Sequence, residues 1–186
     1  TLQLPDVPEA FSDVVAPTTS AINTMGLGDA LAEALMKRIG LTPDQFRVFH
    51  PSGKLGAQLL KTSDVMLQGD DVATIAPTAT MDQAIIKMAE KNVGGVVVID
   101  ENHHVMGLIT DGDLKRHMGP TLLAQRVDRV MSKNPQTIAP DLLAVEAVNQ
   151  MLKRPGGNVI TSLIVADGPL FKGLIRVQEC LKVGLI

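Results

Sequence analysis

The clearest pattern along the chain is a helical spacing of apolar residues that is followed by two short apolar runs. Thr80 is placed to cap the N-terminus of this helix, because a threonine side chain accepts a hydrogen bond from a free backbone amide. The apolar face of the helix consists of Ala84, Ile85, Met88 and Ala89. The runs 96–100 and 105–110 predict two strands joined by the polar turn 101–104, and a second helix is expected from Asp111. A short strand before Thr80 completes a predicted β-α-β-β-α unit.

This pattern occurs twice, and the second copy follows the first by about 65 residues. Five pairs of blocks keep their order and spacing: 64–66 with 129–131, 74–77 with 137–140, 82–88 with 145–151, 95–100 with 162–167, and 107–109 with 173–175. Chance similarity does not preserve such an order, so the chain contains an internal repeat. One unit alone would leave a sheet face uncovered, whereas two stacked units bury it. We predict an α/β (α+β) fold with repeats at 61–124 and 125–186.

Residues 1–60 do not take part in the repeat. Apolar residues at helical spacing predict a helix over 21–39 that Gly40 ends, and Pro43 begins a short helix. A strand is expected at 2–4. One strand and a few helices cannot close a core by themselves. The segment therefore either packs on the repeats or forms the end of a larger α/β domain.

The composition excludes several classes of protein. The 186 residues carry a formal net charge of −3, and no basic cluster offers a surface for nucleic acid. Trp and Tyr are absent and only four Phe occur, so aromatic platforms for bases or sugar rings are scarce. The single cysteine, Cys180, excludes an internal disulfide and is expected in the core. No apolar stretch reaches the roughly 20 residues of a membrane helix and no signal peptide is recognised, so we expect a cytoplasmic protein that contacts no membrane.

Adjacent histidines at His103 and His104 invite a metal-site hypothesis. On a tight turn between strands, however, neighbouring side chains diverge, and no third ligand is close in sequence. We therefore expect no metal site and no catalytic cofactor.

Each repeat ends in a related motif: Gly-Leu-Ile-Thr-Asp-Gly-Asp at 107–113 and Gly-Leu-Ile-Arg-Val-Gln-Glu at 173–179. With the repeat pattern, these motifs resemble the CBS domain, and the pair resembles a tandem CBS module. The resemblance implies that an adenosine-type nucleotide binds in a cleft between the repeats. It also implies that Thr110 and Asp113 hold the phosphate and the ribose hydroxyls, and amides at a helix N-terminus suit a phosphate.

The candidate nucleotide-binding residues are Thr110, Asp111, Asp113, Arg116, Arg176 and Glu179. In the second repeat Arg176 and Glu179 replace the threonine and the aspartate, which weakens the case for a second, equivalent site. Arg176 either forms a surface ion pair or contacts an anionic group of a ligand shared between the repeats. For Thr110 and Asp113, a plain helix cap is the alternative to a ligand contact.

The first 60 residues contain four segments that resemble the end of a sugar-isomerase (SIS) domain. These segments are 8–10, 16–20, 28–32 and 50–56. A SIS domain followed by a CBS pair is similar to the D-arabinose 5-phosphate isomerase family, which interconverts D-ribulose 5-phosphate and D-arabinose 5-phosphate. The resemblance implies that Glu9 and His50 belong to the catalytic site, where isomerisation needs acid and base groups. A Lys, a further Glu and a phosphate-binding loop would lie upstream of Thr1, so we expect the 186-residue chain to have no isomerase activity by itself.

The leading hypothesis is a regulatory CBS pair that senses a nucleotide and reports it to an isomerase domain. The resemblance makes the cytidine monophosphate conjugate of 3-deoxy-D-manno-octulosonate an attractive ligand, and AMP and ATP are further candidates. Self-association as a dimer or tetramer is expected. One alternative is a structural CBS pair that dimerises and binds no small molecule, and another is a sugar-phosphate isomerase in its own right.

Overall fold

The computed structural model describes residues 2–11, 13, 16–50, 53–153 and 159–186, which fall into two compact units. Unit 1 comprises Thr1–Phe49 and unit 2 comprises His50–Ile186. Residues 50–60, which the sequence analysis grouped with the N-terminal segment, lie in unit 2. Ala57 is buried there, and Leu60 packs against the core of the second repeat.

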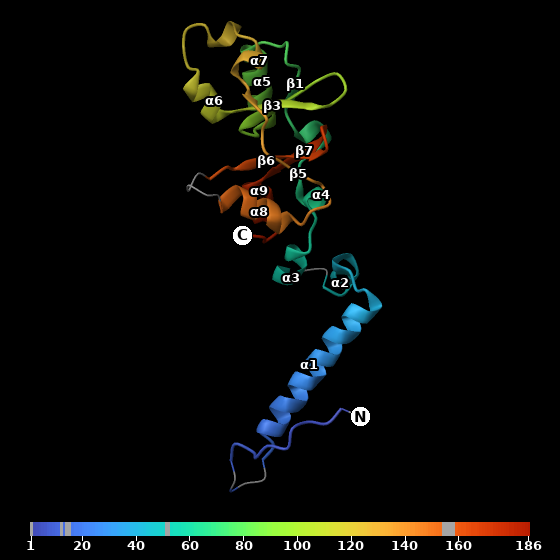
Figure 1. The fold of residues 1–186 in the computed structure, drawn as a ribbon. Helices are drawn as coiled ribbons and strands as arrows, with labels where there is room; N and C mark the ends of the chain where they lie inside the picture. The colour runs from blue at the N-terminus through green and yellow to red at the C-terminus, as the bar shows by residue number, and fades with distance from the viewer. Residues whose placement is uncertain (1, 12, 14–15, 51–52, 154–158) are drawn as a thin grey trace. The chain divides into compact units, whose positions relative to one another are not determined.

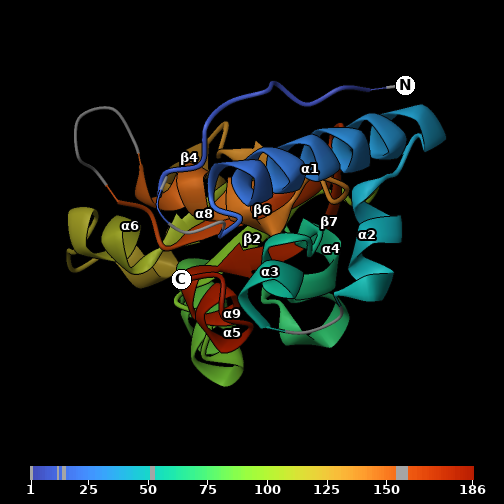
Figure 2. The same ribbon diagram turned by 90° about the horizontal axis from the view of Figure 1, so that it is seen from below.

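Unit 1 is mostly helical. Helix α1 (Thr19–Ile39) is one continuous helix in Figures 1 and 2, and helix α2 (Pro43–Phe49) follows it. Gly40 ends α1 in the left-handed conformation with φ of 65°, as its lack of a side chain allows. The strand expected at 2–4 is wrong, because residues 2–11 form neither strand nor helix and the described part of unit 1 contains no partner strand.

Unit 2 contains the two repeats. Its elements up to residue 124 are α3 (Gly53–Gln58), α4 (Thr62–Val65), η1 (Gly69–Asp71), β1 (Thr74–Ile75), α5 (Met81–Lys91), β2 (Gly95–Ile99), β3 (Val105–Thr110), α6 (Asp111–Arg116) and η2 (Leu122–Ala124). The elements that follow are α7 (Val127–Val130), β4 (Ser132–Lys133), β5 (Thr137–Ile138), α8 (Ala144–Leu152), β6 (Ser162–Asp167), β7 (Leu170–Arg176) and α9 (Val177–Lys182). The predicted β-α-β-β-α order is confirmed in both repeats.

The expected cap of α5 is confirmed, and its expected apolar face is confirmed in part. Thr80 is the N-cap residue, and its backbone amide donates a hydrogen bond to Gln83 Oε1 at 3.2 Å. Ala84 and Met88 are buried on the apolar face, but Ala89 is exposed. The helix therefore presents a narrower apolar face to the core than its sequence suggested.

The strands form two mixed sheets. In the first, β1 is parallel to β2, and β3 is antiparallel to both β2 and β4. In the second, β5 is parallel to β6, and β7 is antiparallel to β6. Helix α5 connects the parallel strands β1 and β2, and helix α8 connects the parallel strands β5 and β6, as the repeat pattern requires.

The sheets face each other and helices cover their outer sides (Figure 1). Successive side chains of a strand point to opposite faces, so each central strand contributes to two cores. Val97 and Ile164 lie in the core between the sheets, whereas Val96 packs toward α5 and Leu163 toward α8. Burial on both faces explains why these strands read as continuous apolar runs.

The segment that leads into each repeat packs on the other repeat. Helix α4 begins the first repeat but packs on α8 and β7 of the second, and Leu67 exchanges two backbone hydrogen bonds of 2.8 and 2.9 Å with Leu174. Helix α7 begins the second repeat but packs on β3 of the first, and β4 pairs with that strand. The boundary between the copies in sequence is therefore not a boundary between two separate cores.

Two glycines permit this exchange. A Cβ atom on Gly173 would lie 2.4 Å from the Leu67 carbonyl oxygen, and one on Gly107 would lie 2.6 Å from Met131 Sδ. Both distances are far below a van der Waals contact, so the repeated glycine before Leu-Ile is required by close approach of the crossing segment.

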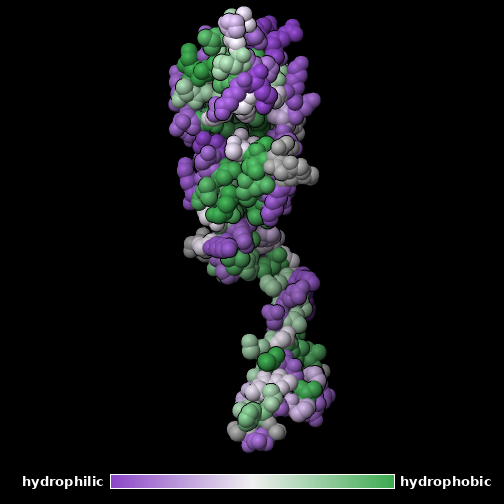
Figure 3. Space-filling model, turned by 90° about the vertical axis from the view of Figure 1, so that its left-hand side faces the viewer, coloured by the Kyte–Doolittle hydropathy of each residue, from purple (hydrophilic) through white to green (hydrophobic). Residues whose placement is uncertain are grey.

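Other apolar side chains remain on the surface of unit 2. Figure 3 shows a hydrophobic area on one face of this unit, with mostly polar residues around it. Ile86, Leu181 and Ile186 are each at least 50% exposed. Cys180, by contrast, is fully buried, which confirms its expected place in the core, and burial raises the pKa of its thiol to about 11.

Candidate functional site

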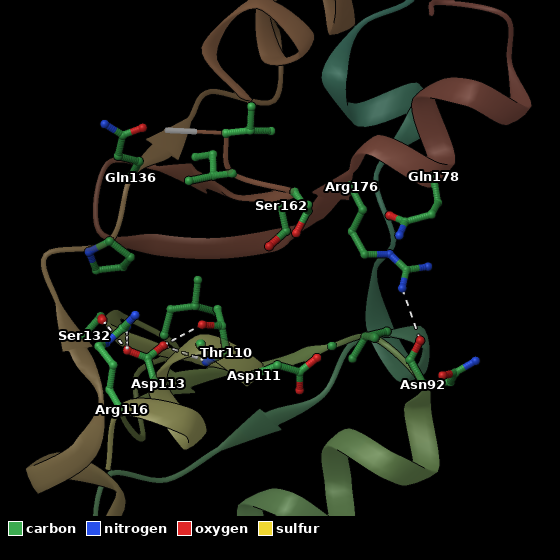
Figure 4. A pocket seen from close by; sticks show the side chains of 18 residues that line it. Asn92, Thr110, Asp111, Asp113, Arg116, Ser132, Gln136, Ser162, Arg176 and Gln178 are labelled. Atoms are coloured by element: carbon green, nitrogen blue, oxygen red, sulfur yellow. Dashed lines mark hydrogen bonds and ion pairs between the residues drawn. The ribbon is translucent and has the colours of Figure 1, made fainter. Parts of the chain in front are cut away.

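A cavity of about 700 Å³ lies between the two repeats of unit 2 (Figure 4). Its lining includes Asn92, Gly94, Thr110, Asp111, Asp113 and Arg116 from the first repeat, and Ser132, Gln136, Ile160, Ser162, Arg176 and Gln178 from the second. The cavity has the volume of a small-molecule site, and most of the side chains that line it are polar or charged.

The first corner of the cavity is the junction of β3 and α6. Thr110 is the N-cap residue of α6, and Asp113 occupies the third position of the helix. The Thr110 amide and hydroxyl both donate to Asp113 Oδ2, at 2.8 and 2.7 Å. Thr110 and Asp113 therefore form the helix cap that was the alternative to a ligand contact, and both residues also line the cavity.

Asp113 is held by partners from three elements. In addition to the bonds from Thr110, its Oδ1 accepts hydrogen bonds from Ser132 Oγ at 2.8 Å and from the Arg116 guanidinium. Only 3% of the residue is exposed. Burial raises the pKa of the Asp113 carboxyl, but the hydrogen bonds from Thr110, Ser132 and Arg116 outweigh burial and hold this pKa below its usual value. The carboxylate is therefore charged and fully hydrogen-bonded at neutral pH.

The corresponding corner of the second repeat is built from Arg176 and Glu179. Arg176 Nε and Nη2 donate to the two carboxylate oxygens of Glu179, both at 2.7 Å. Lys182 Nζ approaches Glu179 Oε1 at 3.4 Å, and Arg176 Nη1 donates to the Asn92 carbonyl oxygen at 3.2 Å. Burial raises the pKa of Glu179, but the bonds and charges of Arg176 and Lys182 lower it below its usual value. Arg176 thus ties the second repeat to the end of α5 in the first.

Asp111 differs from the other charged residues of the cavity. Its side chain lies between the two corners in Figure 4 and has no hydrogen-bond or ion-pair partner among the described residues. Gly94 has φ of +65°, and a Cβ atom added to it would lie 3.7 Å from Asp111 Oδ2. Asp111 therefore contributes a free negative charge to a cavity whose other carboxylate is neutralised.

Five of the six candidate nucleotide-binding residues line this one cavity. The exception is Glu179, which does not line it but holds the Arg176 side chain in place. The sequence analysis missed Ser132, Gln136 and Gln178. Ser132 directly follows the repeated Val-Met dipeptide, but its place beside Asp113 depends on the exchange of leading segments, which no local pattern shows.

Glu9, one of the two candidate catalytic residues, lies in unit 1. Glu9 Oε2 accepts hydrogen bonds from the Thr18 amide and hydroxyl, at 2.7 and 2.8 Å, and from the Ser20 amide at 3.3 Å. The bonds from Ser20 and Thr18 lower the pKa of Glu9 to about 2. In this structure the carboxylate serves the N-terminal end of α1, where free amides favour an anion. His50 begins unit 2, so a catalytic site that contains both residues stands on the resemblance alone.

The described residues contain no group of three or more His, Cys, Asp or Glu side chains arranged to hold a metal ion. At the turn that follows β2, the His104 ring lies 3.2 Å from Asp100 Oδ2, and His103 has φ of 60°. None of the helices in the described part of the chain combines the length and the apolar character that a membrane crossing requires.

Comparison with known sequences identifies both repeats. The family model of the CBS domain matches residues 63–119 and 127–185. The arabinose 5-phosphate isomerase KdsD of Yersinia pestis is 38% identical over 175 residues, which cover 92% of this chain and 52% of that protein. The chain thus spans about half the length of the curated relatives that it matches in this way.

Solved structures share the fold of unit 2. A CBS domain-containing protein of unknown function from Bacillus anthracis covers 70% of this chain and 96% of its own, with a TM-score of 0.58 and 17% identity. CBSX2 in complex with AMP covers 68% and 96%, with a TM-score of 0.57 and 20% identity. At these identities the structures establish the fold, and the family model establishes the kinship. The chain therefore belongs to the CBS domain family, of which it contains a tandem pair.

Proposed function

We propose that unit 2 binds a nucleotide in the cavity between the CBS repeats and that this binding regulates a sugar-phosphate isomerase domain. The observation that carries the proposal is the cavity itself, because it joins the Thr110 and Arg176 corners in one space. Its volume of about 700 Å³ accommodates a nucleotide or a nucleotide conjugate. The AMP complex of CBSX2, a protein of the same fold, supports a ligand of this class.

The hydrogen bonds of Asp113 suggest how a nucleotide enters. A ribose hydroxyl donates to an acceptor, and the Asp113 carboxylate can accept this hydrogen bond only if it releases one of its present partners. Arg116 is the partner most easily released, because its side chain is 64% exposed while that of Asp113 is 4% exposed. Release of Arg116 would offer its guanidinium to a phosphate, for which planar paired donors are well suited. Binding of a ribose and of a phosphate would thus be coupled through one ion pair.

The isomerase part of the proposal rests on similarity to KdsD and on the N-terminal segment. Helix α1 has no buried residue, and its exposed apolar side chains include Ile22, Met25 and Ile39. Such a face fits a helix that belongs to a larger domain. Glu9 and His50 would supply part of its catalytic site. The remaining Lys and Glu are expected upstream of Thr1, so the 186-residue chain is expected to show no turnover of D-arabinose 5-phosphate in a coupled assay.

The proposed physiological ligand is the cytidine monophosphate conjugate of 3-deoxy-D-manno-octulosonate, with AMP and ATP as alternatives. The conjugate carries a phosphate and a carboxylate, and the cavity offers Arg116 and Arg176 as partners for anions. Regulation by such an end product would act as feedback on the isomerase. Activity of the CBS pair joined to its SIS domain should then fall as this conjugate is added.

Differential scanning calorimetry of the 186-residue chain tests nucleotide binding. A ligand at a hundred times its dissociation constant stabilises the folded state by about 2.7 kcal/mol, which shifts the melting temperature by several degrees. Calorimetry suits this chain because it lacks Trp and Tyr, so intrinsic fluorescence offers little signal. A shift with AMP, ATP, CMP or the conjugate supports the proposal. No shift with any of them contradicts it.

A second candidate function is a structural CBS pair that associates with itself and binds no small molecule. The hydrophobic area on unit 2 in Figure 3 and the Arg176–Glu179 pair in the second corner favour it. This candidate requires a dimer or tetramer whose stability does not respond to nucleotides. A strict monomer in light scattering excludes the structural function, whereas an oligomer whose melting temperature shifts with no nucleotide supports it.

A further inference from the structure

The two corners of the CBS pair occupy equivalent places but differ in what fills them. Thr110 and Arg176 are both N-cap residues, and Asp113 and Glu179 both stand three residues later. The threonine is short and bonds to its aspartate at 2.7 Å, which leaves room beside it in the cavity. At the second corner, Arg176 donates to both carboxylate oxygens of Glu179, and Glu179 itself does not line the cavity.

The Arg176–Glu179 pair is largely buried, so a ligand that separated the two side chains would lose much of its binding free energy. The side chains of Arg176 and Glu179 are 16% and 6% exposed. Their two parallel bonds have the bidentate geometry that makes such pairs strong. A ligand that used Glu179 as the ribose acceptor would leave the arginine unpaired in a mostly dry place, which is costly.

Arg176 nevertheless retains donors toward the cavity that it lines. Three of the five N–H groups of its guanidinium are used, by the two oxygens of Glu179 and by the Asn92 carbonyl oxygen. Lys182 shares Glu179, so two cations face one carboxylate, and this corner carries an excess positive charge. Arg176 can therefore accept an anionic group without releasing Glu179.

The first corner has the opposite balance. Asp113 is neutralised by Arg116, and Asp111 adds a negative charge that has no partner among the described residues. The cavity thus has a hydroxyl-accepting side near Asp113 and an anion-accepting side near Arg176. Figure 4 shows Asp111 and Asp113 on one side of the cavity and Arg176 on the other.

We propose that each chain binds a single nucleotide-type ligand, because Arg176 and Glu179 close the second corner, and that Arg176 recognises a second anionic group of that ligand. The inference rests on the proposed function and adds its stoichiometry and a specificity-determining residue. The ligand class is a nucleotide with two anionic groups, such as a nucleoside diphosphate or a nucleotide joined to an acid.

Isothermal titration calorimetry of the 186-residue chain with AMP, ADP, CMP and CDP tests the stoichiometry. We expect one site per chain for whichever base binds. Asp113→Ala should weaken this binding at least tenfold and leave no site of the original affinity, since the chain has no second site. A stoichiometry of two, or half of the sites surviving in Asp113→Ala, overturns this inference but leaves nucleotide binding intact. Absence of binding to all four nucleotides, together with no melting-temperature shift with ATP or the conjugate, contradicts the proposed function as well.

The role of Arg176 is tested by comparing the monophosphate and diphosphate of the same base. We expect the diphosphate to bind about tenfold more tightly, and Arg176→Gln to remove most of that preference, because a hydrogen-bonded charge pair is lost. Lys182→Gln is the matched control: Lys182 also contacts Glu179, but it is 73% exposed and does not line the cavity, so its charge is screened by solvent and most of the preference should stay. An unchanged preference in Arg176→Gln overturns the assignment.

Arg176→Gln leaves Glu179 without its main partner and is a risk to folding. The double variant Arg176→Gln with Glu179→Gln removes both charges together, and an amide pair of similar size can still hydrogen-bond. This double variant should fold and show the same loss of diphosphate preference. Retention of the preference in a folded double variant contradicts a role for the Arg176 charge.

Discussion

Removal of the Asp113 side chain is the most informative single change, because its carboxylate both caps α6 and lines the cavity. Asp113→Ala eliminates hydrogen bonds from the Thr110 amide and hydroxyl, from Ser132 and from Arg116. Loss of a helix-capping side chain costs about 1 kcal/mol. The orphaned Thr110 and Ser132 donors in a part-buried place add about 1 to 3 kcal/mol.

We therefore expect Asp113→Ala to lower the free energy of unfolding of unit 2 by about 3 kcal/mol. For a domain of this size the melting temperature should fall by roughly 10 °C in differential scanning calorimetry. At a temperature well below that transition, nucleotide affinity should fall at least tenfold, or about 1.4 kcal/mol. The two effects are separable, since binding is measured on the folded variant.

Asp128→Ala is the control for Asp113→Ala. Asp128 also pairs with an arginine, Arg126, at 2.7 Å, but this pair is outside the cavity and its arginine is 52% exposed. Its loss should cost at most about 1 kcal/mol and leave nucleotide affinity unchanged. The reasoning is refuted if Asp113→Ala melts like the parent protein, or if it binds nucleotide with full affinity.

Three further predictions concern packing, charge and pH. Gly173→Ala should lower the free energy of unfolding by about 2 kcal/mol or more in calorimetry, because its Cβ would collide with the Leu67 carbonyl oxygen. Gly119→Ala is the control and should be nearly neutral, because its Cβ makes an ordinary contact at 3.9 Å. Equal stability of the two variants would contradict the crossing of the leading segments. Asp111→Asn should strengthen ADP binding by roughly threefold in titration calorimetry, since an unpaired negative charge leaves the cavity, and weaker binding would show that Asp111 accepts a ligand hydroxyl instead. The pKa values of Asp113 and Glu179 are lower in the folded chain than their usual values, so both carboxylates stabilise the fold at neutral pH, and this stability is lost as the pH falls below about 4. The melting temperature of Glu179→Gln should therefore fall less in acid than that of the parent protein. An identical fall in both proteins would count against this linkage.

The sequence predicted the repeat architecture because its signal is local and duplicated. The apolar runs of β2 and β6 and the cap at Thr80 occupy the places that periodicity assigned to them. The failed strand at 2–4 shows the limit of a local pattern, since a strand needs a partner and the described part of unit 1 provides none. Ala89 is exposed because the core covers a narrower face of α5 than the pattern alone indicates.

The charged residues that line the cavity were predictable from the sequence, because the two related motifs pointed to both corners. The spacing of Thr110 and Asp113 pointed to a cap or a ligand contact, and the structure shows that both residues form the cap and also line the cavity. The approach of Ser132 to Asp113 and of Arg176 to Asn92 depends on contacts between distant parts of the chain. Such contacts follow from the exchange of leading segments, which leaves no mark on the spacing of residues within one repeat.

A crystal structure of the 186-residue chain with a bound nucleotide tests the central claim most directly. Our account predicts one nucleotide per chain, with its ribose hydroxyls at Asp113, a phosphate near Thr110 and Arg116, and a further anionic group near Arg176. The Arg176–Glu179 pair should remain intact in the complex. A nucleotide bound against Glu179, or bound outside the cavity between the repeats, would contradict the account.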